Sequence, residues 1–448
     1  MRQKRDFVKS LFLLTPIFLP FEGYSLNYGS ISLSVPLIFI IIISFFSLIR
    51  VFLIGYLKGG WFYVLLILTA GVFSCISGIY FGVPISKLTT SLLLITILII
   101  FFISISQINF EKSKLDKLIK IIINYSCILA VIGLYQVIAN NTSLPDLYFR
   151  FNNPVIGGQK ISVLGTFVRP TSVFAEPSWL GHYMLFSFFL LLGHKEYFNK
   201  KRYNIYLIIL ILSIIFSLSF GTFLLWAITV LAFKIIKMSS VSRRHFTNTK
   251  NTKRILVPIV LLFIAFGLIF RNFITMFLNA LVSRINIVID SLRLYSSSST
   301  SFVRYDSVTM RLSLSILGAK MFVRFPVLSV IFGAGIGGFQ YALAKYFSYT
   351  FGYSGFGWTN LLVEQGIFGL FAYLIFMLNL VISFIKLSLD SHYRTYYSEI
   401  NSFILILLML FFDGFTGGLG FERSILIWFL FTLSFIYYKA LREEVNKA

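Results

Sequence analysis

The residues whose types and spacing best suit chemistry lie in one short segment, which contains Arg169, Glu176 and His182. A guanidinium near a membrane surface can bind two phosphate oxygens at once. Because proline fits the first position of a helix, Pro177 predicts a helix start with Glu176 at its N-cap. The helix dipole stabilises a carboxylate there, although Glu176 could instead serve as a base. His182 would lie about a turn and a half into this helix, either lining a cavity or packing between helices.

A second group of candidates is basic and lies in residues 271–355, which hold only two acidic residues, Asp290 and Asp306. Arg311 and, more weakly, Arg304 are candidates for contact with an anionic substrate, which such a positive field attracts. For most of these residues individually, contact with anionic lipid is the alternative. The basic residues of the segment are Arg271, Arg284, Arg293, Arg304, Arg311, Lys320, Arg324 and Lys345.

For other polar residues we consider a structural role before a role in binding or catalysis. The glycine cluster at 333–338 could bind a phosphate with its backbone N–H groups, but it could also simply form a tight turn. Asp413, Glu422 and Arg423 are expected to form a local ion pair, and Arg423 is also a candidate for substrate contact. The sequence has no CxxC or HExxH motif and its four histidines are scattered, so we expect no metal or cofactor.

The composition is that of a membrane protein. Hydrophobic residues make up 58% of the 448 residues and charged residues only 12%, and the mean hydropathy is +0.87. A soluble domain carries about 25% charged residues. We therefore predict an all-α polytopic membrane protein that forms one integral membrane domain, residues 1–448. Twelve apolar runs are long enough to be spans: about 10–26, 32–49, 61–82, 88–107, 118–139, 178–193, 203–219, 221–237, 255–270, 356–385, 400–418 and 424–438.

Basic residues set the predicted orientation. With both termini in the cytoplasm, most of the 39 Lys and Arg residues fall in cytoplasmic loops. This bias explains most of the net charge of +23, which is therefore no evidence for nucleic acid. Two long loops, 140–178 and 271–355, then lie on the outer face. Within the second, amphipathic patterns predict short helices at 277–295 and 307–323.

Three motifs, in order, resemble a known group. The stretch from Arg169 to Tyr183 resembles the R-P-T-x-x-F-x-E-P-S segment of Wzy-type polysaccharide polymerases, in the O-antigen ligase and polymerase superfamily. Arg311, followed by Phe325-Pro326 and the 333–339 glycine cluster, is similar to the pattern at the end of that family's large outer loop. The run from Asn360 through Glu364 to Leu370 resembles the family's N-x-L-x-E-x-G-I-x-G-L sequence.

The resemblance implies a GT-C-like fold in a bacterial inner (cytoplasmic) membrane. It implies a glycosyltransferase that polymerises polyprenyl-diphosphate-linked oligosaccharide repeat units on the outer face. Arg169 and Arg311 correspond to the family's two essential arginines, and Asn360 and Glu364 become candidate substrate-binding residues. The expected partners are the lipid-linked donor, the growing glycan acceptor and membrane lipids, with a chain-length regulator as a further candidate.

The chemistry that this implies is the departure of a sugar from a diphosphate. Arginines would stabilise the charge that develops on the leaving group. A carboxylate would deprotonate the acceptor hydroxyl; Glu176 is the first candidate, with Asp306 and Glu364 behind it. Two alternatives stay open: a ligase that transfers glycan to a lipid acceptor, and a transporter or flippase for a lipid-linked glycan. No internal repeat of the transporter kind is found. Trp358 and Thr359 stand where the ligase branch often has a histidine before the asparagine, which favours the polymerase.

Overall fold

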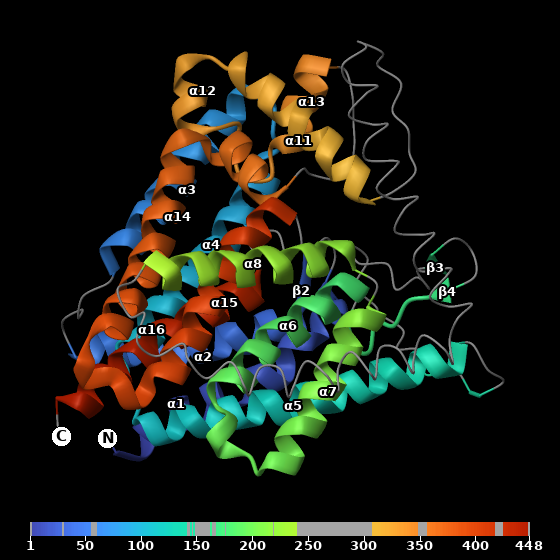
Figure 1. Ribbon diagram of the computed structural model, residues 1–448. Coiled ribbons are helices and arrows are strands. Elements are labelled where there is room, and N and C mark those ends of the chain that lie inside the picture. The colour runs from blue at the N-terminus through green and yellow to red at the C-terminus, as the bar shows by residue number, and fades with distance from the viewer. Residues whose placement is uncertain are drawn as a thin grey trace.

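The computed structural model describes residues 2–28, 31–54, 61–140, 144, 145, 147, 162–163, 167–174, 176–217, 219–239, 307–347, 356–416 and 424–446. Over these residues the chain is mainly helical (Figure 1). The first half contains α1 (Arg2–Phe18), α2 (Val35–Ile54), α3 (Trp61–Tyr80), α4 (Ile85–Ser106), α5 (Lys112–Asn140), α6 (Pro177–Gly193), α7 (Lys200–Phe216) and α8 (Phe220–Ser239). The second half contains α11 (Ser307–Val323), α12 (Val327–Phe332), α13 (Phe339–Phe347), α14 (Gly357–Leu389), α15 (Tyr397–Thr416) and α16 (Ile425–Val445).

Short elements connect these helices. Three 3-10 turns are η1 (Leu19–Gly23), η2 (Lys195–Tyr197) and η4 (Ser391–Tyr396). The strands β1 (Ser25–Tyr28) and β2 (Ile31–Ser34) form an antiparallel hairpin in which Leu26 is paired with Leu33. The strands β3 (Ser162–Val163) and β4 (Phe167–Val168) form a second antiparallel pair directly before Arg169.

The helices identify an all-α, multi-pass membrane protein. Six described segments are long and apolar enough to cross a membrane: Phe62–Tyr80, Ile85–Ser106, Lys112–Ala139, Gly357–Leu389, Ser391–Phe415 and Ile425–Val445. Each predicted span within the described residues overlaps a helix, whereas the span predicted at 255–270 lies outside them. The helix predicted at 307–323 is confirmed as α11, and the one predicted at 277–295 lies outside the described residues.

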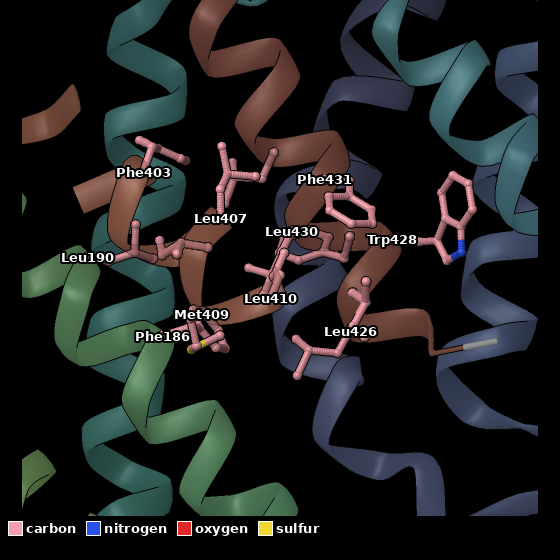
Figure 2. Close-up of a cluster of buried hydrophobic side chains, with 14 of the residues drawn as sticks. Phe186, Leu190, Phe403, Leu407, Met409, Leu410, Leu426, Trp428, Leu430 and Phe431 are labelled. Carbon is pink, nitrogen blue, oxygen red and sulfur yellow. The ribbon is translucent and has the colours of Figure 1, made fainter. Parts of the chain in front are cut away.

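Buried hydrophobic side chains form two clusters. The larger fills the bundle, and Figure 2 shows its centre, where α6, α15 and α16 pack through Phe186, Leu410 and Trp428. The smaller lies where α11, α12 and α13 meet the ends of α3 and α4, and includes Leu314, Met321 and Phe339. In Figure 1, α11 to α13 form a cap at one end of the molecule, which α3 and α14 reach from the bundle.

Glycines let particular helices approach closely. A Cβ at Gly193 would lie 2.4 Å from Ser402 of α15, so a larger residue at the end of α6 would push these two helices apart. The same holds at Gly181, where a Cβ would lie 2.6 Å from Oγ1 of Thr222 in α8. The seams that α6 makes with α15 and α8 therefore depend on small residues, as is common for helices packed in membranes.

Candidate functional site

Arg169 lies in a loop that the amide of Gln136 holds in place. The Oε1 atom of Gln136 accepts hydrogen bonds from the backbone N–H groups of Thr171 (3.0 Å) and Ser172 (2.7 Å), and its Nε2 donates to the Ser172 carbonyl (3.1 Å). Ser172 has a left-handed φ of 53°, and its hydroxyl donates to the Leu129 carbonyl of α5. Gln136 is fully buried. Because a buried amide with satisfied partners fixes its neighbours, the backbone after Arg169 has one defined path along α5.

The Arg169 side chain is itself buried, with 9% of the residue exposed. Its Nε donates a 2.9 Å hydrogen bond to the carbonyl of Ser217, the C-cap of α7. The carbonyl end of a helix carries partial negative charge, which favours a guanidinium there. The arginine predicted to bind phosphate is thus anchored at the turn between α7 and α8.

Glu176 and Pro177 occupy the positions that the sequence predicts. Glu176 is the N-cap of α6 and Pro177 its first residue. The half-buried carboxylate of Glu176 accepts a 3.0 Å hydrogen bond from the hydroxyl of Ser178. Backbone N–H groups of Trp179 and Leu180 donate to its carbonyl oxygen. The carboxylate lies at the positive end of the α6 dipole.

His182 lies at a helix–helix contact and forms a buried ion pair. Its Nε2 is 2.9 Å from Oδ1 of Asp413 on α15, and the two side chains are only 2% and 3% exposed. Nδ1 contacts the Ser178 carbonyl within α6 and lies 3.4 Å from Oγ1 of Thr222 on α8. The expected partnership of Asp413 with Glu422 and Arg423 lies partly outside the described residues, which include neither 422 nor 423.

Arg311 lies on α11, half-buried, near the start of α14. Its carbonyl accepts from the hydroxyl of Ser315 (2.8 Å), which in turn accepts from the backbone N–H of Phe356 (2.7 Å). One turn further, Gly318 faces Thr359, and a Cβ there would lie 2.8 Å from it. These contacts fix α11 against α14. Arg304 and Arg423, the other predicted arginines, and Asp306 lie outside the described residues.

The glycine cluster is a turn between α12 and α13, and its amides bind the chain itself. The carboxylate of Glu364 accepts from the backbone N–H groups of Gly337 (2.7 Å) and Phe339 (3.4 Å), and its carbonyl accepts from Gly335 (3.0 Å). Glu364 is 2% exposed. The tight turn is therefore confirmed. The amides of residues 335, 337 and 339, which a phosphate would have needed, already bind Glu364.

The same turn interlocks with a break in α14. Gly366 has a φ of 68°, which interrupts the helical backbone of α14, and Gly333 has a φ of 79°. A Cβ on Gly333 would lie 2.2 Å from the Glu364 carbonyl oxygen, and one on Gly366 would lie 2.3 Å from the Ile331 carbonyl oxygen. Asn360, one turn before Glu364, is 5% exposed. The second and third sequence motifs thus form one packed unit.

Several residues of the site carry no motif that could have revealed them. Gln136 lies in α5 and Ser217 at the C-cap of α7, and only the folded chain brings them to the segment of Arg169. The sequence predicts a local ion pair of Asp413 with Glu422 and Arg423, not a contact with a histidine. The observed partner of Asp413, His182, could not be inferred from spacing, because the two lie on different helices.

Chemically, the residues placed above include a buried guanidinium, a second guanidinium, a buried histidine–aspartate pair and a half-buried carboxylate. Guanidinium groups suit the recognition of phosphate oxygens, and a carboxylate can accept a proton from a hydroxyl. A comparison of the sequence with family models and with curated proteins finds no match.

Proposed function

We propose that this protein is a membrane glycosyltransferase that polymerises polyprenyl-diphosphate-linked oligosaccharide repeat units into a surface polysaccharide. The observation that carries the proposal is the placement of Arg169. It is buried beside the α7 C-terminus, in a loop fixed by Gln136. A buried, anchored guanidinium in a protein of apolar helices is expensive to keep, which favours a functional role.

Arg311 supports the same reading. It is half-buried on α11, and α11 packs against the start of α14, which carries the third sequence motif. In the proposed reaction, the bond between the anomeric carbon of the donor and the diphosphate oxygen breaks while the acceptor hydroxyl attacks. Arg169 and Arg311 stabilise the negative charge that develops on the diphosphate.

Glu176 is the proposed base that takes the proton of the acceptor hydroxyl. The Glu176 carboxylate is half-buried and accepts a hydrogen bond from the hydroxyl of Ser178. Glu364 is less suitable, because its oxygens accept from the glycine turn. The same proposal includes a GT-C-like fold with twelve spans and with both termini in the cytoplasm. It places the site on the outer face of a bacterial inner membrane. It also includes the growing glycan as acceptor and a chain-length regulator as partner.

The test is elongation by purified protein in liposomes that contain lipid-diphosphate-linked repeat units, followed by separation of the glycans by length. The wild type should give a ladder of products. Arg169→Ala and Arg311→Ala should each lose at least about tenfold in rate, as for the removal of a group that stabilises the transition state. Arg324→Ala, an exposed arginine at the end of α11, is the matched control and should elongate normally.

Two outcomes would replace the proposal. If the wild type moves a verified substrate between leaflets without elongating it, the protein is a transporter. If it transfers glycan once to a lipid acceptor and produces no ladder, it is a ligase. Folding of each variant is checked by its size-exclusion profile and its melting temperature, so that a loss of activity can be assigned to chemistry.

A further inference from the structure

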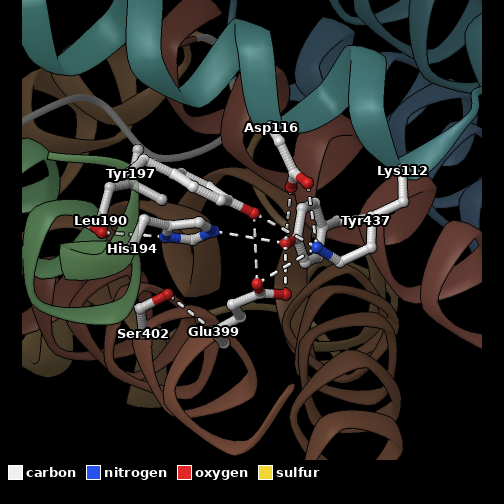
Figure 3. Close-up of polar contacts among 8 residues, drawn as sticks. All are labelled: Lys112, Asp116, Leu190, His194, Tyr197, Glu399, Ser402 and Tyr437. Atoms are coloured by element: carbon white, nitrogen blue, oxygen red, sulfur yellow. Dashed lines mark hydrogen bonds and ion pairs between the residues drawn. The ribbon is translucent and has the colours of Figure 1, made fainter. Parts of the chain in front are cut away.

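A second group of ionisable side chains lies at the opposite end of α6 and α15, away from the site described above. It contains Lys112 and Asp116 of α5, His194 after α6, Tyr197 of η2, Glu399 of α15 and Tyr437 of α16 (Figure 3). Both chain termini lie near this end of the bundle in Figure 1. No sequence motif marks this cluster, and the proposed glycosyl transfer does not use it.

Lys112 neutralises only part of the negative charge of the Asp116 and Glu399 carboxylates. Its ammonium group lies 2.9 Å from Oδ2 of Asp116 and 3.1 Å from Oε1 of Glu399. The side chains of Lys112, Asp116 and Glu399 are 10%, 19% and 14% exposed. One ammonium and two carboxylates leave a net charge of −1 in a largely buried place. An uncompensated charge there is unfavourable, because burial removes its hydration.

The other carboxylate oxygens face a single hydroxyl. The Tyr437 oxygen lies 2.7 Å from Oε2 of Glu399 and 3.1 Å from Oδ1 of Asp116. A hydroxyl carries one proton, so it can donate to one of these oxygens only. The second oxygen–oxygen contact needs a proton of its own to be attractive.

The remaining neighbours do not supply that proton. His194 donates from Nδ1 to the Leu190 carbonyl at 2.9 Å, and burial lowers the pKa of His194 to about 4. The imidazole is then neutral at pH 7, and its Nε2, 3.3 Å from the Tyr437 oxygen, is a further acceptor. The hydroxyl of Tyr197 donates to Oε1 of Glu399 (3.2 Å) and accepts from Lys112 (3.2 Å). Tyr396 of η4 presents its ring to Lys112 at 5.0 Å.

We propose that Asp116 and Glu399 together bind one additional proton, which they share through the hydroxyl of Tyr437. With that proton the cluster is neutral, and each of the two oxygen–oxygen contacts holds one hydrogen. The proton belongs to the pair rather than to either carboxyl, as in other coupled sites. The cluster is thus a proton-binding site that joins α5, α15 and α16, and its release of the proton at high pH would leave a buried negative charge and weaken this joint. This inference is independent of the proposed function.

A metal ion is the competing explanation, because Asp116, His194 and Glu399 place ligand atoms within 4.8 Å of one another. The contacts favour the proton. The Tyr437 hydroxyl lies among these three ligand atoms, at hydrogen-bonding distances from each, and Lys112 already supplies one positive charge. Metal ligands would instead lie about 2 Å from a common centre.

The experiment is infrared spectroscopy of purified wild-type protein in lipid nanodiscs at a series of pH values. At pH 7 we expect a carbonyl stretching band of a protonated carboxylic acid that shifts on deuteration and disappears as the pH rises. Asp116→Asn and Glu399→Gln should each remove this band, because one neutral amide already makes the cluster neutral. Glu444→Gln, which changes an exposed carboxylate of α16, is the matched control and should keep the band.

Thermal unfolding over the same pH range gives a second readout. The melting temperature of the wild type should fall as the band disappears, whereas that of Asp116→Asn should not fall over this range. Absence of a protonated-acid band in the wild type, or its persistence in both folded variants, overturns the proposal. So does elemental analysis that finds one bound metal per chain in the wild type and none in His194→Ala. If both carboxyl variants fail to fold, Tyr437→Phe tests the same bridge, and an unchanged titration of the band then contradicts the proposal.

Discussion

His182 and Asp413 pair at 2.9 Å between α6 and α15, in a place where both side chains are almost completely inaccessible. Asp390 and His392 form a pair of the same chemical kind at 2.8 Å, but these side chains are 44% and 78% exposed. The first pair joins two helices in a buried place, whereas the second lies within one exposed turn, where Asp390 also accepts from the backbone N–H of His392.

The first prediction uses this comparison. Asp413→Ala should destabilise the protein by about 3–5 kcal/mol, because it leaves the buried His182 without its carboxylate. The measurement is chemical or thermal unfolding of the detergent-purified protein. His392→Ala, which removes the exposed pair but keeps Asp390 as the N-cap of η4, is the control and should change the melting temperature little, since exposed pairs contribute little. A comparable loss in both variants would show that burial of the His182 pair is not what makes it important.

The second prediction concerns the turn between α12 and α13. Gly333→Ala should lower the melting temperature strongly, because its Cβ would lie 2.2 Å from the Glu364 carbonyl oxygen. Gly82→Ala is the control, because Gly82 has a similar φ of 71° but no atom within 4 Å of the added Cβ. The control should cost only the backbone strain, about 1–2 kcal/mol. Equal effects of the two substitutions would mean that backbone strain, and not the close contact, accounts for the glycine.

The third prediction separates structure from substrate binding at Glu364. If the Glu364 carboxylate only stabilises the glycine turn between α12 and α13, Glu364→Gln should keep one acceptor oxygen for the Gly337 amide. This variant should then elongate glycan at near the wild-type rate. Glu364→Ala should lose stability by about 1–3 kcal/mol, because it leaves buried amides unsatisfied. Rates and melting temperatures of both variants are compared. A Gln variant that is fully stable and inactive would assign Glu364 to the reaction instead.

A fourth prediction tests the support of Arg169. Gln136→Ala should lower the elongation rate and cost about 1–3 kcal/mol of stability, because the Thr171 and Ser172 amides lose their buried acceptor. Gln107→Ala, at the end of α4 and only partly buried, is the control and should leave both quantities nearly unchanged. Normal elongation by a folded Gln136→Ala protein would show that the loop does not position Arg169 for the reaction.

Local features of this protein could be predicted from sequence because their causes are local. Proline after glutamate marks the start of α6, and apolar periodicity ended by Pro326 marks α11, so both were predicted at their observed bounds. The partners of polar groups could not be predicted. Glu364 and Gly337 lie 27 residues apart, and which amides a buried carboxylate binds depends on how α12, α13 and α14 pack.

The proton-binding cluster was missed for the same reason. Lys112 and Asp116 lie in a segment without a motif, and nothing in their spacing shows that Glu399 and Tyr437 will meet them. The break in α14 was also missed, because a single glycine in an apolar run is common in membrane helices. The positive φ of Gly366, together with the Ile331 carbonyl that an added Cβ would meet, gives this glycine a specific reason.

The two polar contacts at opposite ends of α6 and α15 have a mechanical consequence. Near one end His182 binds Asp413, and at the other His194 and Glu399 meet at Tyr437. Contacts at both ends hold α6 and α15 in one register and one relative orientation, which a single contact would not do. We therefore expect these two helices to move as one rigid unit. The cap of α11 to α13 has a small core of its own and packs against the break of α14 at Gly366, so it is joined to the bundle by a separate set of contacts.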